Sequence, residues 1–263
     1  MKECKLNNSP IVYHVAENGH DQWILFLHAA FVDHHMFDAQ VEFFRKDYNV
    51  MTIDIIGHGG STCARKGDTI QKMSLWINEI LAERSISKIH VVGVSIGAVL
   101  AQDFANQYPQ RVASLACFGG YDINDFDPKV QKENDAGHAL MMLKAIFSVK
   151  WFAEDNKKIS AYTTPAQEAF YEMNLRFPKK SFMYLGGLNR MVNVHKPSPR
   201  PYPLLIGCGE HDIPAELILV DLWKKKEPTV SVMVFEGAGH CVNMDVPDAF
   251  NQILHRFLQD GTL

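Results

Sequence analysis

Hydrophobic residues in this chain follow two alternating periods, and this alternation restricts the fold more than any other feature of the sequence. Short apolar runs such as 23–27 and 89–94 have the length and composition of strands buried on both faces. Between such runs, apolar residues recur every three or four positions, which is typical of amphipathic helices. We expect strands over 11–15, 23–27, 50–55, 89–94, 112–118, 203–207 and 230–235.

The predicted helices occupy the intervals between these strands. Apolar residues at helical spacing indicate helices over 37–48, 70–81 and 96–104, and Pro109 closes the third. A last helix covers 247–258, with a proline in its first turn. Strands that alternate with helices in this way predict an α/β fold, in which a mostly parallel sheet carries helices on both faces. Ligands of such folds bind beyond the carboxyl ends of the strands.

Residues 122–198 break this rhythm, because no part of them has the pattern of a buried strand. Helical patterns occur at 141–146, 170–177 and 182–191, and the proline-rich stretch 197–201 reads as a linker. We interpret the segment as a helical insertion between two core strands. The predicted domains are therefore a core of residues 1–121 and 199–263 and a helical cap, or lid, of residues 122–198.

The pentapeptide Gly93-Val94-Ser95-Ile96-Gly97 lies where the strand 89–94 passes into the next helix. Small flanking residues let a sharp strand-to-helix turn close, and such a turn exposes the serine hydroxyl above the sheet edge. The backbone N–H of Ile96 would then point to where an oxyanion forms. This context favours Ser95 as a nucleophile over the alternative of a plain glycine-bounded turn.

A serine nucleophile needs a base, and the base needs an acid to orient it. His240 follows the last predicted strand, which puts it on the same sheet edge as Ser95. The alternative for this histidine is a loop residue bonded to backbone. Asp212 follows the preceding strand and is the preferred acid. Glu210 and Asp122 remain competing acids, because both also lie just beyond core strands.

Four further blocks of sequence extend this pattern. They are Leu25-Phe26-Leu27-His28, a DxxGHGxS-like block at 54–61, an AQ…YPxRV-like block at 101–112, and GxxD and GH blocks at 207–212 and 239–240. With these blocks the chain resembles the α/β-hydrolase superfamily, in particular small esterases, thioesterases and C–C hydrolases with a helical cap. The order Ser, Asp, His along the chain is the order described for that fold. The resemblance covers about residues 23–120 and 203–258 and points to no particular substrate.

The resemblance also implies a second oxyanion donor, the backbone N–H of Ala30. Members of the superfamily usually have His-Gly where this chain has His28-Ala29. Glycine adopts a positive φ cheaply and alanine does not. We therefore expect either that Ala29 has an ordinary φ or that the loop 28–35 is shaped differently.

A group of three histidines and one cysteine could each be taken for a reactive site, but a structural interpretation is preferred for both. His28, His34 and His35 are close in sequence, but the resemblance makes His28 a structural brace of the oxyanion loop, so no metal is expected. Cys241 stands beside the proposed base. A thiolate needs its own base and an electropositive setting, so the serine is favoured over this cysteine as the nucleophile.

The predicted cap is rich in methionine and aromatic residues, which suits an adaptable apolar wall for an acyl chain or an aromatic substrate. The alternative for each of these residues is simple packing of the lid on the core. The candidate substrate-binding residues are Phe31, Met141, Phe147, Trp151 and Met183.

The function expected from these features is hydrolysis of an ester or thioester of a small, apolar acyl or aromatic substrate, through an acyl-enzyme on Ser95. The proposed chemistry needs no cofactor. The same residues could serve C–C bond hydrolysis, perhydrolysis or a lyase reaction. A rival from another class is a ligand receptor that keeps the fold without turnover, and the complete set of Ser95, Asp212 and His240 argues against it.

Composition narrows the range of partners and compartments. The chain carries 26 basic and 30 acidic residues, a formal charge of −4, which argues against nucleic-acid binding. No apolar run approaches the roughly 20 residues that a membrane span needs. The five cysteines are scattered without a CxxC pair, so a disulfide framework or zinc ribbon is not expected. We expect a cytoplasmic protein with a small-molecule substrate, and the sequence does not indicate its oligomeric state.

Overall fold

The computed structural model describes residues 1–126, 148–196 and 199–263. One eight-stranded sheet has the strand order β1-β2-β4-β3-β5-β6-β7-β8. β1 and β2 are antiparallel to their neighbours, whereas β3 to β8 run parallel to one another. The strands are β1 (Lys2–Lys5), β2 (Val12–Ala16), β3 (Trp23–Leu27), β4 (Asn49–Ile53), β5 (Ile89–Val94), β6 (Val112–Phe118), β7 (Leu204–Gly209) and β8 (Ser231–Phe235).

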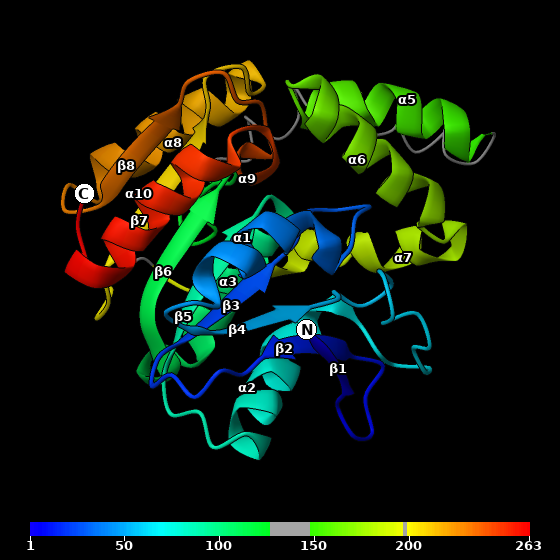
Figure 1. Ribbon diagram of the computed structural model, residues 1–263, viewed down its shortest axis with the longest axis horizontal. Helices are drawn as coiled ribbons and strands as arrows, with labels where there is room; N and C mark the ends of the chain where they lie inside the picture. Colours follow the sequence, from blue (N-terminus) through cyan, green and yellow to red (C-terminus); the bar gives the residue numbers. More distant parts are fainter. Residues whose placement is uncertain (127–147, 197–198) are drawn as a thin grey trace.

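Helices cover both faces of this sheet (Figure 1). Strand side chains alternate between the faces, so each face has its own apolar core. Phe26, Val92 and Leu205 pack with α1 and α10 on one face, whereas Leu25 and Val91 pack with α2, α3 and α8 on the other. The helices are α1 (Asp38–Phe44), α2 (Met73–Glu83), α3 (Ile96–Gln107), α8 (Pro214–Lys226) and α10 (Pro247–Asp260). The predicted α/β fold, a mostly parallel sheet between two helical layers, is therefore confirmed.

The first strand was not expected from the sequence. β1 has the sequence Lys-Glu-Cys-Lys, and three of its four residues are exposed. It is the edge strand of the sheet, where charged residues discourage pairing with another chain. Such a strand lacks the apolar alternation that identifies strands in sequence, and only its pairing with β2 defines it.

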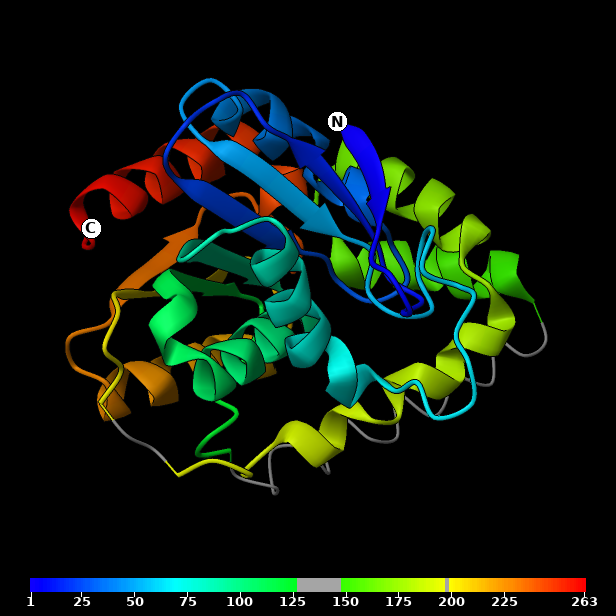
Figure 2. The same ribbon diagram turned by 90° about the horizontal axis from the view of Figure 1, so that it is seen from below.

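Three helices that the structure describes between β6 and β7 lie together at one side of the sheet (Figures 1 and 2). They are α5 (Val149–Ser160), α6 (Thr164–Arg176) and α7 (Phe182–Leu185). The helix expected over 182–191 is in fact two short pieces, α7 and a 3-10 turn, because Gly186 and Gly187 separate them and glycine has low helix propensity. The helix expected over 141–146 lies outside the described residues. The division into core and cap stays a prediction.

The remaining helical elements are short. They are the 3-10 turns η1 (His34–Phe37), η2 (Ile70–Lys72), η3 (Pro109–Arg111), η4 (Lys179–Ser181) and η5 (Leu188–Met191), and the single α-helical turn α9 (Val242–Asp245). In the part of the chain that the structure describes, no helix combines the length and the apolar character needed to cross a bilayer.

The start of α3 packs directly against the end of β3, and Gly97 makes this approach possible. A Cβ atom added to Gly97 would overlap with the carbonyl oxygen of Leu27 and would lie 2.8 Å from that of His28. Both obstacles are backbone atoms, so they cannot move aside as a flexible side chain could. The glycine therefore fixes the helix close to the sheet.

Replacing Gly97 with alanine should destabilise the protein, because the added methyl group forces α3 away from β3. Overpacking of this kind costs about 1–3 kcal/mol, which thermal unfolding would report as a lower Tm. Gly186→Ala is the matched control, since the nearest atom to the added Cβ would be the carbonyl oxygen of Met183, 3.8 Å away. Equal losses in the two variants would contradict the explanation.

Candidate active site

The parallel register brings the ends of β5 to β8 to one edge of the sheet. Val94 lies opposite Phe118, Phe118 lies opposite Gly207, and Gly209 lies opposite Phe235. The loops after these strands therefore leave the sheet side by side. The predicted residues after β5, β7 and β8 share this edge, as the sequence pattern indicates.

Ser95 forms a sharp turn between β5 and α3. Its backbone has φ 57° and ψ −120°, a region that favours glycine. Its N–H donates to the carbonyl oxygen of Phe118 at 2.8 Å, which holds the turn against β6. A side chain at Gly93 would overlap with the carbonyl oxygen of Gly97, so the turn can close only with glycine there. The residue is half-buried at the start of α3.

His240 and Asp212 form a close pair from two neighbouring loops. The Nδ1 atom of His240 lies 3.0 Å from Oδ1 and 3.2 Å from Oδ2 of Asp212. The Asp212 carboxylate is fully buried, and His240 is mostly buried. A backbone hydrogen bond from His211 N–H to the carbonyl oxygen of Ala238, at 2.8 Å, ties the two loops together. This pairing engages Nδ1 of the imidazole ring and thereby fixes the orientation of the ring.

Charge around His240 favours its protonated form. Burial alone would lower the pKa of His240, but the charge and hydrogen bonding of Asp212, with a smaller contribution from Glu216, raise it to about 9. The imidazolium form is therefore stabilised at this position.

Gly119 links the serine turn to the histidine. It follows Phe118, whose carbonyl oxygen accepts the Ser95 N–H. A Cβ atom on Gly119 would lie 2.9 Å from Cε1 and 3.0 Å from Nδ1 of His240, so the imidazole ring packs on the backbone here. Gly119 has φ 56°, which again favours glycine. Phe118, the last residue of β6, contacts the Ser95 turn, and the next residue, Gly119, contacts the His240 ring.

The competing acids are engaged elsewhere. Glu210 is largely exposed, and its carboxylate accepts the Gly237 N–H at 3.2 Å. Asp122 is buried and pairs with Arg200 at 3.2 Å. Among the three candidate acids, Asp212 is the one hydrogen-bonded to His240.

Glu216 is a further acid near this pair that sequence reasoning missed. It lies in the first turn of α8, and its Oε2 atom is buried without a hydrogen-bond partner in the described residues. Burial raises the pKa of Glu216 to about 7, with His240 opposing the rise and Asp212 adding to it. The signal available in the sequence was an acid four residues after Asp212, at the start of a helix.

The loop after β3 is braced by His28 and Asp54. His28 is fully buried, accepts the Ile55 N–H at 3.0 Å through Nε2, and pairs with the carbonyl oxygen of Ala29 at 2.7 Å through Nδ1. Burial lowers the pKa of His28, which agrees with a ring whose Nε2 accepts the Ile55 N–H. Phe31, rather than Ala29, has the positive φ in this loop, at 68°. The loop therefore accommodates alanine at position 29 by placing the strained residue two positions later.

Aromatic side chains gather around Phe31. Its ring contacts those of Phe152, Phe177 and Phe182, with centroids 4.9 to 5.3 Å apart. A pocket of about 270 Å³ is lined by Phe31 and Phe177 together with residues of the loop after β3. These contacts join the loop to α5, α7 and the end of α6.

Two other predicted substrate-binding residues are described by the structure, and both are exposed on helices between β6 and β7. Trp151 is 51% exposed on α5, and Met183 is 75% exposed on α7. Met141 and Phe147 lie outside the described residues. Of the three candidates that the structure describes, Phe31 lines the pocket of about 270 Å³. Phe152, Phe177 and Phe182 were missed as members of its cluster, although their aromatic character is visible in the sequence.

Asp245, five residues after His240, anchors the histidine loop to the helices α5 and α6. Its carboxylate accepts the N–H groups of Gly239 at 2.9 Å, Tyr162 at 3.0 Å and Thr163 at 2.7 Å, and the Thr163 hydroxyl at 2.9 Å. The neighbouring Cys241 N–H donates to the carbonyl oxygen of Ser160 at 2.8 Å. The loop that carries His240 is thus fixed to the α5–α6 turn.

Cys241 itself is unsuited to act as a nucleophile. It is fully buried, and burial raises the pKa of its thiol well above the usual value, with Asp245 and Asp212 adding to the rise. Nucleophilic thiols need the opposite shift. The sequence-based preference for Ser95 over Cys241 agrees with this environment.

Comparison with known proteins identifies the family. The family model described as the alpha/beta hydrolase family matches residues 24–253. The match spans the strands from β3 to β8 and the first half of α10. The chain therefore belongs to the alpha/beta hydrolase family, as the sequence motifs indicated.

Individual relatives are distant but cover most of the chain. Monoacylglycerol lipase ABHD6 of Mus musculus is 26% identical over 91% of this chain and 76% of its own length. The (E)-2-((N-methylformamido)methylene)succinate hydrolase of Acinetobacter baylyi is 21% identical over 98% of each chain. A thermophilic esterase of Thermogutta terrifontis superimposes with a TM-score of 0.80 and 18% identity, covering 99% of each chain. Hydrolases of these kinds support an enzymatic role for the chain.

Asp245→Ala should destabilise the protein, because four donors lose their shared acceptor. Leaving even one buried donor unsatisfied costs about 1–3 kcal/mol, and more where the lost partner is charged. We expect chemical denaturation to give a free energy of unfolding lower by at least about 2 kcal/mol. Asp221→Ala is the control, since the Asp221 side chain is 73% exposed on α8. A stability equal to that of the control variant would refute the anchoring role.

Proposed function

We propose that the protein is a serine hydrolase, with Ser95 as nucleophile, His240 as general base and Asp212 as the acid that orients it. The observation that carries this proposal is the 3.0 Å pair of His240 and Asp212, whose imidazole packs on Gly119 beside the Ser95 turn. Membership of the alpha/beta hydrolase family supports it, because the order Ser, Asp, His is that of the fold's hydrolases.

The reaction we propose is acyl transfer in two halves. Ser95 Oγ attacks the substrate carbonyl carbon, and its proton passes to His240. The N–H groups of Ile96 and Ala30 hold the oxyanion. As the carbonyl re-forms, the bond to the leaving group breaks and His240 returns the proton to that group. Water then attacks the acyl-enzyme with the same proton transfers, which releases the acid and restores the Ser95 hydroxyl.

The pair of His240 and Asp212 favours this proton transfer. His240 becomes an imidazolium in each half of the reaction, and the buried Asp212 carboxylate stabilises that cation. The raised pKa of His240 reflects the same interaction. Glu216 lies close enough to add to it, so we assign it a supporting electrostatic role.

The substrate we propose is an ester or thioester with a small apolar acyl or aromatic group. The aromatic cluster of Phe31, Phe152, Phe177 and Phe182 supports this, because Phe31 directly follows the proposed oxyanion donor Ala30. Esterase and lipase activities are named for two of the similar proteins. We further propose that residues 122–198 act as a cap, with α5 to α7 forming its described part.

Ser95→Ala should abolish turnover and labelling by a fluorophosphonate, because the variant lacks the oxygen that forms the covalent bond. A panel of p-nitrophenyl esters of increasing chain length and matching acyl-thioesters would measure kcat/KM. Ser87→Ala, at an exposed serine after α2, is the matched control and should retain both properties. Unchanged turnover in Ser95→Ala would overturn the mechanism.

The pH dependence of kcat/KM tests whether His240 is the general base. His240 accepts a proton only when neutral, so kcat/KM should rise as pH increases through the His240 pKa of about 9. Asp212→Asn removes the main charge that raises this pKa, so the rising limb should move to lower pH. The plateau should fall by roughly 10³–10⁴-fold because the imidazolium is no longer stabilised.

Glu210→Gln is the matched control for this experiment, since Glu210 is exposed and contacts Gly237 and His211. Its profile should follow that of the unmodified protein. A limb that stays in place in Asp212→Asn would show that Asp212 does not set the pKa of the base.

A further inference from the structure

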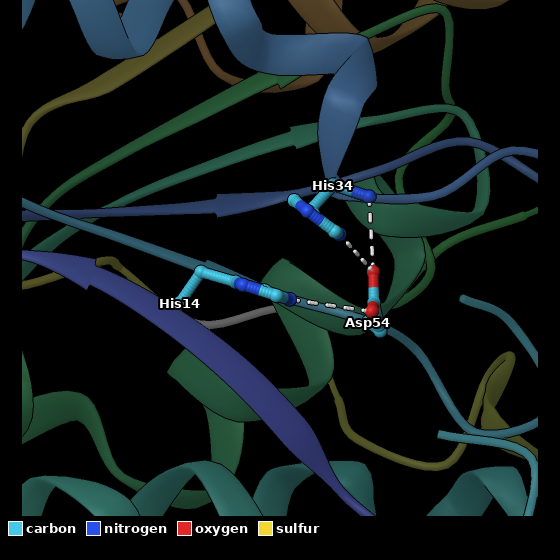
Figure 3. Close-up of side chains that lie close together, drawn as sticks. All are labelled: His14, His34 and Asp54. Carbon is cyan, nitrogen blue, oxygen red and sulfur yellow. Dashed lines mark hydrogen bonds and ion pairs between the residues drawn. The ribbon is translucent and has the colours of Figure 1, made fainter. Parts of the chain in front are cut away.

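Two histidines and an aspartate from separate segments converge in one cluster (Figure 3). His14 belongs to β2, His34 to η1, and Asp54 follows β4. His34 Nδ1 lies 2.9 Å from Oδ1 of Asp54, and His14 Nε2 lies 3.5 Å from Oδ2. One donor atom from each residue falls within 4.8 Å of the other two. Sequence proximity pointed to His28, His34 and His35, but His28 is engaged with backbone instead.

We propose that His14, His34 and Asp54 form a binding site for a divalent first-row transition-metal ion of the Zn²⁺ class. Two imidazoles and one carboxylate are a ligand set that such ions use, with further positions left for water. Ligand atoms at about 2.1 Å from one ion lie about 3.0–3.4 Å apart when their bonds meet at 90–110°. Each imidazole nitrogen lies close to that distance from one carboxylate oxygen, with His34 Nδ1 at 2.9 Å from Oδ1 and His14 Nε2 at 3.5 Å from Oδ2, and one ligand atom from each residue lies within 4.8 Å of the other two.

The charges around the cluster favour a cation. The Asp54 carboxylate is fully buried, and its ion-pair partners among the described residues are the two histidines. The rings of His14 and His34 stack with centroids 3.6 Å apart and an angle of 19°. Two imidazolium cations in that arrangement would repel each other strongly. A single divalent ion bound by neutral rings would compensate the buried carboxylate without that repulsion. The in-plane nitrogen lone pairs of stacked rings run nearly parallel, so one ring must turn out of the stack for both nitrogens to reach the same ion.

The cluster is accessible from a pocket. His34 lines the pocket of about 270 Å³ that also holds Asp33, His35, Gly59 and Gly60. The pocket reaches the cluster at His34, whereas His14 and Asp54 are not among its lining residues, so an ion would enter from the His34 side. Asp33 and His35 form a second group of donors that overlaps the first at His34, and the Asp33 carboxylate also pairs with Arg176 at 3.4 Å.

An ion at this site would fasten the loop that carries the proposed oxyanion donor. Asp54 already accepts the backbone N–H groups of His34 at 3.0 Å and Gly60 at 2.8 Å. Metal bonds to His14 and His34 would join this loop to β2 as well. The site does not involve Ser95, so the inference is independent of the proposed reaction.

The test is metal binding by chelator-treated protein. Equilibrium dialysis against Zn²⁺, with metal content measured by mass spectrometry, should give one tightly bound ion per chain. Co²⁺ should give visible absorption bands of a nitrogen- and oxygen-ligated ion. His14→Gln and His34→Gln should each weaken binding by at least tenfold, whereas His211→Gln, at an exposed histidine, should leave it unchanged.

Two further measurements keep the result interpretable. Circular dichroism of the metal-free proteins establishes that each variant is folded, independently of metal binding and of the proposed reaction. His35→Gln distinguishes the two overlapping groups, and it should retain the ion if the site is the one proposed. The proposal is overturned by an unmodified protein that takes up no stoichiometric Zn²⁺. It is also overturned if folded His14→Gln binds as tightly as the unmodified protein, or if His35→Gln loses the ion while His14→Gln keeps it.

Discussion

The hydrogen-bond ladder between the parallel strands continues one residue beyond the ends of β5, β6 and β7. Ser95 donates to Phe118 at 2.8 Å, Gly119 to Gly207 at 2.9 Å, and Glu210 to the last residue of β8 at 2.9 Å. Each loop at the candidate site therefore starts from a position that the sheet still controls. Side chains that project from such fixed starting points are held more precisely than those on free loops.

Buried carboxylates complete the arrangement that the ladder begins. Asp54 joins the loop after β3 to the turn at Gly60, and Asp245 joins the loop of His240 to the α5–α6 turn. Asp212 does the same for the His240 ring. Each carboxylate accepts from segments that are distant in sequence, so the buried charges organise loops rather than the apolar core. Removing one of these carboxylates leaves buried donors unpaired, so its loss lowers the stability of the protein.

Much of this arrangement was predictable from local sequence, because Ser95, Asp212 and His240 each follow a recognisable strand. The long parallel strands were predictable for the same reason, since their apolar runs are continuous. β1 was missed because its exposed charged residues carry no apolar pattern. Three residues were missed because their roles depend on contacts between segments that are 24 or more residues apart: Glu216, Asp245 and His14. The spacing of apolar residues carries no information about such contacts.

The backbone conformation of Ser95 lowers the stability of the fold at the position of the proposed nucleophile. A side chain at φ 57° is held in a conformation that costs of order 1–3 kcal/mol, which the ladder contact to Phe118 and the packing of α3 must offset. Glycine at this position would relieve much of that cost but would remove the hydroxyl. The chain thus retains a residue that its own fold disfavours, and selection for thermal robustness alone would act against the serine.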